Sequence, residues 1–471
     1  MKDSEGMRRK QKTQLGGCPQ EGRVELGDNA GVLSISTASE RGRDVEGGCT
    51  SDLLEEILDK GNLNRAYKRV KFNKGSHGVD GMKVDELLPF LRQQGETIKQ
   101  ELLEGTYRPS PVRRVEIPKP DGGVRLLGIP TVLDRWIQQA VCQVLTPVFE
   151  EGFSENSYGF RPGQGAKQAV EAARKHVENG YKWTVDLDLE KFFDRVNHDK
   201  LMAQVARKIQ DRRVLKLIRL YLESGVMLNG VKVETEEGVP QGGPLSPLLS
   251  NVMLDSFDKE LERRGHKFCR YADDSNIYVK SRRAGERVME SITKYLEKTL
   301  KLKVNREKSA VDRPQRRKFL GFSFYYRKDG VGIRVHEKPI QKFKQRVKEL
   351  TSRSNAMSMK QRITELNQST TGWVNYFGIA DMRNRMLEMD EWVRRRLRMC
   401  IWKQWKKIKS KHDNLVWLGV ETHRAWEFAN TRKGYWRTSN SPILSTTLHN
   451  QYLESLGFKS LAKRYSLVHQ S

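Results

Sequence analysis

The sequence lacks the features of a secreted or membrane protein. Its five cysteines are odd in number and scattered, and none forms a Cys-x-x-Cys pair. This argues against a disulfide framework and excludes an ordinary cysteine-rich zinc module. No run approaches the roughly 18 apolar residues of a membrane helix, and the chain opens with charged residues. We therefore expect no membrane span and no signal peptide, and a reducing cytoplasm fits.

Negative charge is also scarce. The 471 residues include 86 Lys and Arg against 59 Asp and Glu, a net charge of +27. Over residues 340–412, eighteen basic residues face six acidic ones, interleaved with Trp373, Tyr376, Phe377, Trp392, Trp402 and Trp405. Such a field attracts polyanions, and basic residues among aromatics suit phosphate neutralisation beside stacking. Nucleic acid is the expected partner, and charge that serves only solubility is the alternative.

Composition divides the chain. Residues 1–50 are rich in Gly, Ser and charge, and we predict a mostly disordered leader. From residue 51 onward hairpins alternate with helices, which indicates an α+β domain, and after residue 332 the pattern is almost wholly helical to about residue 411. The predicted hairpins lie over 112–127, around 229–230 and over 267–280. A further strand is expected at 182–187, and helices at 131–149, 165–178, 198–223 and 246–264.

Aspartates mark two of the predicted strands. Asp273 and Asp274 stand at the tip of a hairpin, where two charges about 4 Å apart repel by roughly 4 kcal/mol at an effective dielectric near 20. Asp-Asp at a turn is also ordinary turn chemistry. The strand at 182–187 places Asp186 and, just beyond its end, Asp188 on one side, where an unpaired carboxylate is costly unless it binds a metal or a partner.

Carboxylates from two adjacent strands suit a pair of Mg²⁺ ions about 3.5–4 Å apart, the geometry for in-line displacement at phosphorus. One ion would lower the pKa of an attacking hydroxyl, and the other would stabilise the leaving oxygens. Hydrolysis and polymerisation share this need. The carboxylates alone therefore do not decide between a nuclease and a polymerase.

Ordered motifs from about residue 51 to the C-terminus resemble the reverse transcriptases of group II introns. Residues 271–274 read Tyr-Ala-Asp-Asp, like a metal-binding box of that family, and residues 188–194 read Asp-Leu-Glu-Lys-Phe-Phe-Asp, like its first carboxylate motif. The resemblance implies that Asp188, Asp273 and Asp274 are catalytic and bind Mg²⁺. It also implies that Phe193 lies under the nucleotide sugar and that Asp186 is a structural neighbour.

Further motifs imply contacts with nucleotide and nucleic acid. Residues 239–247 resemble the segment that touches template and nucleotide, 117–130 the fingers hairpin, and 319–324 the primer-gripping hairpin. Residues 158–162 and 302–309 are also similar to the family. The implied nucleotide contacts are Lys119, Arg125, Phe193, Gln241 and Lys308, the last a candidate general acid. The implied template or primer contacts are Arg161, Gly242, Gly243, Tyr271 and Gly321. A merely solvated basic hairpin is the alternative for Lys119 and Arg125.

Residues 340–412 resemble the thumb, called the maturase or X domain, including Gly-Trp-Val-Asn-Tyr-Phe at 372–377. Three helices there would hold a primer–template duplex by its phosphates and intron RNA by shape. A bundle with a solvated basic face is the alternative. The candidate RNA contacts are Arg394, Arg395, Arg396, Lys403, Lys406 and Lys407. Many relatives end in an endonuclease with paired cysteines and histidines, which has no counterpart after residue 411, so the resemblance is to endonuclease-lacking, bacterial class C-like members and implies no DNA cleavage.

The resemblance implies a right-hand polymerase. Fingers and an antiparallel palm would span 51–335, a helical thumb 336–412 and a short nucleic-acid-binding tail 413–471. The implied protein is a bacterial cytoplasmic RNA-directed DNA polymerase that uses two Mg²⁺ ions and dNTPs, and acts as a monomer or dimer on RNA. Its partners would be group II intron RNA, bound as a maturase, and an RNA template with a DNA primer or target DNA during retrohoming. The alternatives are a splicing cofactor with vestigial polymerase chemistry, or a reverse transcriptase of a retron or diversity-generating element.

Overall fold

A computed structural model describes residues 52–118, 123–228, 231–233 and 237–470. The predicted leader, residues 1–50, and the turns at 119–122 and 229–230 lie outside these ranges. The described residues fall within one unit, Cys49–Ser471. In that unit no described helix is long and apolar enough to cross a membrane.

The fingers consist of a small sheet and the helices around it. Strands β1 (Val112–Pro118) and β2 (Val124–Ile129) form the predicted antiparallel hairpin, and β1 also pairs in parallel with β4 (Val226–Leu228), which is followed by β5 (Val231–Val233). Helix α4 (Val132–Glu150) begins after Thr131, whose hydroxyl accepts a hydrogen bond from the N–H of Asp134. The other elements are α1 (Leu53–Ile57), α2 (Lys60–Asn73), the short η2 (Val84–Glu86) and α3 (Leu87–Glu104).

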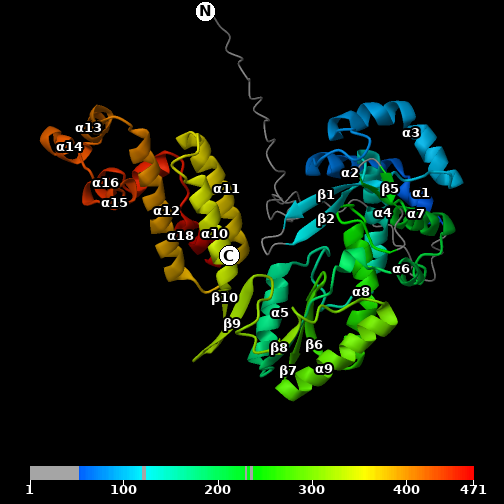
Figure 1. The fold of residues 1–471 in the computed structure, drawn as a ribbon. Coiled ribbons are helices and arrows are strands. Elements are labelled where there is room, and N and C mark those ends of the chain that lie inside the picture. The colour runs from blue at the N-terminus through cyan, green and yellow to red at the C-terminus, as the bar shows by residue number, and fades with distance from the viewer. Residues whose placement is uncertain (1–51, 119–122, 229–230, 234–236, 471) are drawn as a thin grey trace, which may run out of the picture. The chain divides into compact units, whose positions relative to one another are not determined.

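The palm is an antiparallel sheet with the strand order β6-β7-β3-β8 (Figure 1). Its strands are β6 (Lys267–Tyr271), β7 (Asp274–Val279), β3 (Trp183–Leu187) and β8 (Ala310–Asp312). Alternate side chains enter different cores: Phe268 and Ile277 join the core around α8 and α9, and Cys269 and Tyr278 join the core that contains α5. The palm helices are α5 (Ala166–Glu178), η3 (Phe192–Asp194), α6 (His198–Val205), α7 (Arg212–Leu222), α8 (Ser246–Arg263), α9 (Arg282–Tyr295) and η4 (Leu296–Leu300).

A two-stranded hairpin, β9 (Phe322–Arg327) and β10 (Gly330–Val335), leads from the palm into the thumb. The thumb helices are α10 (Glu337–Leu350), α11 (Met359–Phe377) and α12 (Arg383–Gln404). They are followed by α13 (Ile408–Trp417), α14 (Thr422–Ala429), α15 (Tyr435–Thr438), α16 (Pro442–Thr447), α17 (Asn450–Ser455) and α18 (Leu461–Gln470). The expected α+β palm with a helical C-terminal region is confirmed.

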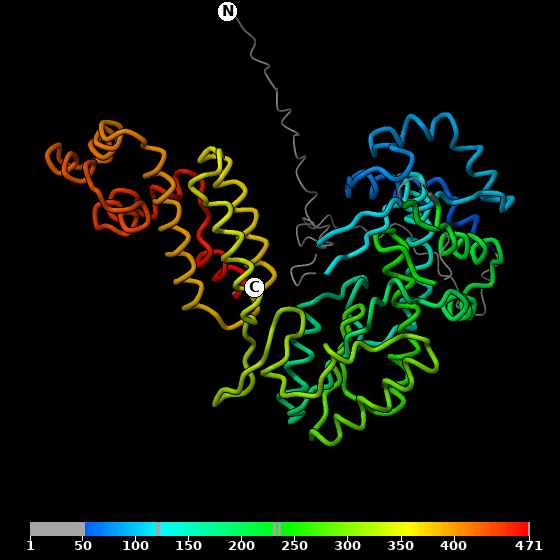
Figure 2. Tube along the Cα trace, viewed as in Figure 1, coloured from blue at the N-terminus to red at the C-terminus, as the bar shows by residue number. Residues whose placement is uncertain are grey.

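The end of the chain, predicted from the sequence as a short nucleic-acid-binding tail, packs against the thumb helices. Helix α18 packs against both α11 and α12 (Figure 2). Buried Asp390 on α12 accepts hydrogen bonds from the Ser460 hydroxyl at 2.9 Å and from the N–H of Leu461 at 2.8 Å. Tyr465 is buried in the same core as the thumb helices. The last helix therefore completes the thumb bundle, because its apolar residues find partners there that local periodicity did not reveal.

Candidate active site

The sheet order brings the predicted catalytic carboxylates together. Strand β7 lies between β6 and β3, so the β6–β7 turn, which holds Asp273 and leads into Asp274, adjoins the end of β3 that precedes Asp188. Asp188 and Asp274 line one pocket of about 500 Å³. Its lining also includes Asp186 and Asn276, which face each other across β3 and β7.

The backbone at Asp188 is held from a distant segment. Its N–H donates to the Ser309 hydroxyl at 3.0 Å, and its carbonyl accepts from the N–H of Asn305 at 2.8 Å. The loop that follows η4 therefore fixes the position of Asp188 at the end of β3.

Neighbouring carboxylates raise the pKa values of Asp273 and Asp274. Burial raises the pKa of Asp273, and the charge of Asp188 raises it further, while Arg125 and Arg270 oppose the rise. Desolvation, followed by the charges of Asp273, Asp186 and Asp188, raises the pKa of Asp274 to about 7. Asp274 is nevertheless exposed as a residue and lines the pocket. Negative charge gathered in this way favours binding of a cation.

Asp186 differs from the other aspartates because it has a cationic partner. Its Oδ2 accepts hydrogen bonds from Nε and Nη2 of Arg317, at 2.8 and 2.5 Å. The same Nη2 donates to the carbonyl of Lys308 at 2.8 Å. Arg317 thus ties Asp186 to the segment that carries Lys308, a role the sequence reasoning missed.

The carboxylates of this site suit a Mg²⁺ ion that takes its remaining ligands from the substrate. Among the described residues, no group of three or more His, Cys, Asp or Glu side chains is already gathered closely enough to hold a metal. Mg²⁺ commonly takes one or two carboxylates, with waters and substrate phosphates as its other ligands. Hard carboxylate oxygens that repel one another at an open pocket match that requirement.

The predicted nucleotide contacts lie at different distances from this centre. Lys308 lines the carboxylate pocket, and Arg125 on β2 is close enough for its charge to lower the pKa of Asp273. Phe193 is half-buried in η3, with its ring centroid 5.1 Å from that of Phe192. The backbone carbonyl of Gln241 accepts from the N–H of Gly128 at 2.8 Å, which fixes its loop to β2. Lys119 lies outside the described residues.

The predicted contact glycines serve internal packing. At Gly242, where φ is +128°, an added Cβ would lie 2.6 Å from the carbonyl oxygen of Gly128, and at Gly243 it would lie 2.4 Å from Oε1 of Gln138. At Gly321, with φ of +89°, it would lie 2.9 Å from the Phe377 ring. Close approach of protein to protein therefore accounts for these glycines. Tyr271 is half-buried, with its ring centroid 6.3 Å from that of Phe160.

Arg161 lies in a different environment from the one predicted. The resemblance implied a contact with template or nucleotide, but the side chain is only 7% exposed. Its guanidinium donates to the Glu150 carboxylate at 2.7 and 2.9 Å and to the carbonyls of Ser154 and Ser157. The guanidinium thus stabilises the segment 154–157. Because the Arg161 side chain is buried, it does not reach a nucleic acid.

The three thumb arginines predicted as RNA contacts are half-buried and make contacts within the protein, and their role as RNA contacts stays a prediction. Arg394 pairs with buried Asp390. Arg395 lies 3.9 Å over the Trp436 ring and donates to the Trp436 carbonyl at 3.0 Å. Arg396 donates to the Thr351 hydroxyl at 2.5 Å, and burial lowers its pKa. These charges hold helices together, whereas Lys406 and Lys407 are exposed, and Lys403 is exposed 5.0 Å from the Tyr435 ring centroid.

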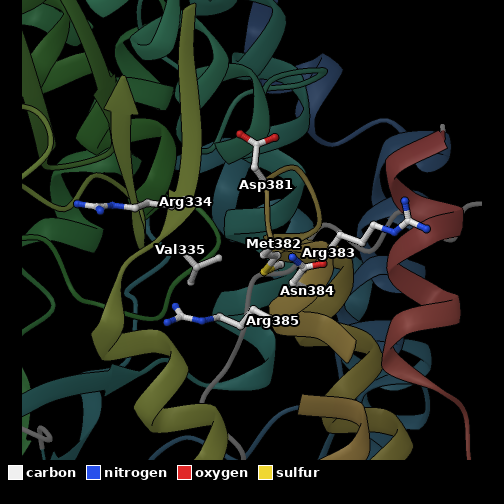
Figure 3. Close-up of a pocket in the computed structure, with 7 residues that line it drawn as sticks. All are labelled: Arg334, Val335, Asp381, Met382, Arg383, Asn384 and Arg385. Carbon is white, nitrogen blue, oxygen red and sulfur yellow. The ribbon is translucent and has the colours of Figure 1, made fainter. Parts of the chain in front are cut away.

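A second pocket, of about 350 Å³, lies where β10 meets the start of α12 (Figure 3). It is lined by Arg334, Arg383 and Arg385 together with Asp381, and none of the three catalytic candidates lines it. Figure 3 shows Arg334 and Arg385 extending to one side and Arg383 to the other. The Oδ2 atom of Asp381 is already used, since it accepts from the N–H of Ile333 at 3.1 Å. This basic pocket is therefore separate from the carboxylate site.

An antiparallel palm with carboxylates at its tip, joined to a basic helical bundle, is the right-hand polymerase architecture that the sequence resemblance implied. Residues 117–324 match the family model of the reverse transcriptase (RNA-dependent DNA polymerase), and residues 340–417 match the maturase-specific domain of group II introns. The chain belongs to the reverse transcriptases/maturases encoded by group II introns. The maturase match favours this family over the retron and diversity-generating alternatives.

The chain is also similar to two curated proteins and to one solved structure. Over 299 residues the chain is 35% identical to Protein YkfC of Escherichia coli (strain K12), covering 55% of this chain and 78% of YkfC. Over 206 residues it is 36% identical to Group II intron-encoded protein LtrA of Lactococcus lactis subsp. cremoris, covering 44% of this chain but only 34% of LtrA. A solved structure, a partial Cas6-RT-Cas1--Cas2 complex, is 24% identical with a TM-score of 0.34, covering 56% of this chain and 47% of that chain.

Proposed function

We propose that this protein copies RNA into DNA from a primer hydroxyl, using two Mg²⁺ ions and dNTPs, and that it binds a group II intron RNA to assist splicing and to copy it during retrohoming. The observation that carries the proposal is the meeting of Asp188 and Asp274 in one pocket with Lys308, beside Asp273. The bacterial cytoplasm is the proposed setting.

The carboxylates of Asp188, Asp273 and Asp274 would hold the metal. Bound there, Mg²⁺ would lower the pKa of the primer 3′-hydroxyl and neutralise charge on the reacting phosphoryl group. The repulsion that raises the pKa of Asp274 is relieved on binding, so the site favours a divalent cation over an empty state.

The remaining contacts come from side chains around the pocket. Arg125 would offer a bidentate fork to the triphosphate, and the Phe193 ring would offer a flat surface to the nucleotide sugar. The Lys308 ammonium, which lines the pocket, would give a proton to the leaving pyrophosphate oxygen. In-line chemistry needs these groups only to orient the substrate and balance its charge, which explains why an open pocket suffices.

Positive charge outside the palm supports binding of an RNA partner. Lys403, Lys406 and Lys407 are exposed where α12 ends, and Arg334 and Arg385 line the second pocket beside the thumb. Exposed lysines and arginines neutralise phosphates without reading sequence. A duplex of primer and template and a folded intron would both be held in this way, by a monomer or a dimer.

The test is extension of an annealed DNA primer on an RNA template with Mg²⁺, comparing the parent protein with Asp188→Ala. The matched control is Asp199→Ala, an exposed aspartate on α6 that pairs with Arg219. We expect cDNA synthesis to be abolished in the first variant and kept in the second, with intron splicing assisted by both. Undiminished cDNA synthesis in Asp188→Ala would contradict the metal site. Splicing assistance by a parent that makes no cDNA would leave the splicing-cofactor alternative.

A further inference from the structure

The turn that carries the catalytic aspartates has an unfavourable backbone conformation. Tyr271 pairs with Asp274, so Ala272 and Asp273 form a two-residue hairpin loop. Ala272 has a φ of +56°, in the left-handed region that glycine adopts readily and alanine does not. Something outside the turn must stabilise it, because alanine alone would favour other conformations.

Arg270 supplies that support from the strand immediately before the turn. Its Nη1 donates to the carbonyl of Ala272 at 2.9 Å, and the whole side chain is buried, with 0% exposure. The other side of the guanidinium is fixed on α8 by Asp258, which is equally buried and accepts at 2.5 to 2.9 Å. Because the buried Arg270 guanidinium is hydrogen-bonded to Asp258 on one side and to the Ala272 carbonyl on the other, that carbonyl has little freedom to move.

A second set of contacts presses on the same turn. Asn251 on α8 accepts from Nη1 of Arg270 at 3.0 Å and donates to the carbonyl of Gly159 at 2.8 Å. An added Cβ at Gly159 would lie only 2.3 Å from the Ala272 nitrogen, so this segment lies directly against the turn. The N–H of Tyr158 also donates to the carbonyl of Arg270 at 2.8 Å. Helix α8, the segment 156–159 and the turn thus meet at one guanidinium.

We propose that Arg270 is a positioning residue for catalysis, whose guanidinium, fixed by Asp258 and Asn251, holds the Ala272 carbonyl and so sets where Asp273 and Asp274 stand relative to Asp188. The inference rests on the proposed polymerase function. Arg270 does not line the carboxylate pocket, and it contacts the turn through the Ala272 carbonyl.

Stability alone does not account for this arrangement. A buried ion pair is often no more stabilising than a well-packed apolar pair of the same volume, because both charges lose their water. An apolar pair, however, could not donate to the Ala272 carbonyl. The hydrogen bond to the turn is the feature that requires an arginine, since its planar fork reaches the carboxylate and the carbonyl together.

The test compares Arg270→Lys with Arg213→Lys. The control is also an arginine paired with a buried aspartate, Asp211, at 3.0 Å, but it lies on α7 away from the palm turn. Lysine keeps the charge and removes the fork. For Arg270→Lys we expect kcat for primer extension to fall by about 10- to 100-fold, because a misplaced catalytic group is costly. We also expect half-maximal activity to need several-fold more Mg²⁺, with little change in the KM for dNTP, while Arg213→Lys behaves like the parent.

Two further variants separate positioning from folding. Asn251→Ala keeps the Arg270–Asp258 pair and removes the amide that contacts both Nη1 of Arg270 and the Gly159 carbonyl. It should therefore shift the Mg²⁺ requirement in the same direction by less. Adding Ala272→Gly to Arg270→Lys should recover part of the activity, since glycine adopts the turn without steric cost. If Arg270→Lys does not fold, Asn251→Ala decides the matter.

Three outcomes would overturn the proposal. They are a folded Arg270→Lys protein with parental kcat and Mg²⁺ dependence, a parental Asn251→Ala, or a defect in Arg270→Lys that Ala272→Gly does not relieve at all. Folding is measured by thermal unfolding and by intron RNA binding, which a local shift of the palm turn would leave unchanged. A parent without cDNA synthesis would contradict the proposed function instead, so the two failures are distinguishable.

Discussion

In the palm, the carboxylates of Asp188 and Asp274 accept no hydrogen bond and form no close ion pair among the described residues, whereas on α12 of the thumb Arg394, Arg395, Arg396 and Arg398 all contact protein groups. Arg394, Arg395 and Arg396 reach Asp390, Trp436 and Thr351 respectively. Arg398 likewise donates to the Ser445 hydroxyl at 3.2 Å. The palm carboxylates are thus open to a ligand, whereas the thumb arginines already serve internal contacts.

This difference shows why a motif and a charge excess deserve different weight. The carboxylates are specified by spacing on neighbouring strands, which fixes where they meet whatever the rest of the chain does. The thumb arginines were inferred from a local excess of positive charge, and charge attracts internal partners as well as phosphates. A basic surface is therefore established only when its residues are seen to be exposed.

The largest expected effect is at the carboxylates. Combining Asp273→Ala with Asp274→Ala should reduce cDNA synthesis by at least about 10³-fold, because the metal no longer stabilises the reacting phosphoryl group. Intron splicing should survive, since the thumb is untouched. Parallel assays of both activities on one preparation check this, and an equal reduction of the two would contradict the separation of palm and thumb roles.

Arg161→Ala should act on stability rather than on substrate affinity. The carbonyls of Ser154 and Ser157 would lose their buried donor, and we expect the free energy of unfolding to fall by about 2–4 kcal/mol.

Arg125→Ala is the contrasting variant, because Arg125 is exposed on β2 and its charge reaches Asp273. It should raise the KM for dNTP with unfolding unchanged. The reverse pattern in denaturant titrations and kinetics would restore a nucleic-acid role for Arg161.

The sequence predicted the elements whose patterns are local. The hairpin over 267–280 is observed as β6 and β7, and the helix expected at 165–178 is observed at Ala166–Glu178. The meeting of Asp188 with Asp273 and Asp274 followed from strand periodicity together with family spacing. Each of these depends on residues close together in the chain or on a motif that carries its own geometry.

What the sequence did not predict depends on distant contacts. Arg396 and Thr351 are 45 residues apart, and Asp390 and Leu461 are 71 apart. No local pattern reveals such pairs. Arg270 could have been suspected, since a charged residue inside an apolar, alternating strand is costly to bury without a partner. Its partner Asp258 on α8 could not have been named without the fold.

Substituting the exposed lysines should have a smaller effect, on RNA binding, which distinguishes them from the thumb arginines that contact protein. Combining Lys406→Ala with Lys407→Ala should weaken intron RNA binding and lower the slope of log affinity against log salt by about 0.7–0.9 for each phosphate that is no longer neutralised. Arg395→Ala should leave that slope unchanged and lower the unfolding temperature, because the cation–π interaction with Trp436 is removed. Filter binding across a salt series measures both slopes, and a slope that falls only in Arg395→Ala would reverse the assignment.

The smallest effect concerns the carboxylates without metal. Because the pKa of Asp274 is raised from an ordinary 3.8 to about 7, the folded state binds its proton more tightly than the unfolded state does. Its ionisation therefore costs stability increasingly as pH rises between those values, and fully above about pH 7. Asp274→Asn should stabilise the metal-free protein by an amount that grows between about pH 4 and about pH 7, and modestly, since an exposed group is screened by solvent. Saturating Mg²⁺ should remove this advantage by stabilising the parent. Thermal unfolding with EDTA and with Mg²⁺ measures the difference, and an advantage independent of both pH and metal would show that packing rather than charge repulsion is its cause.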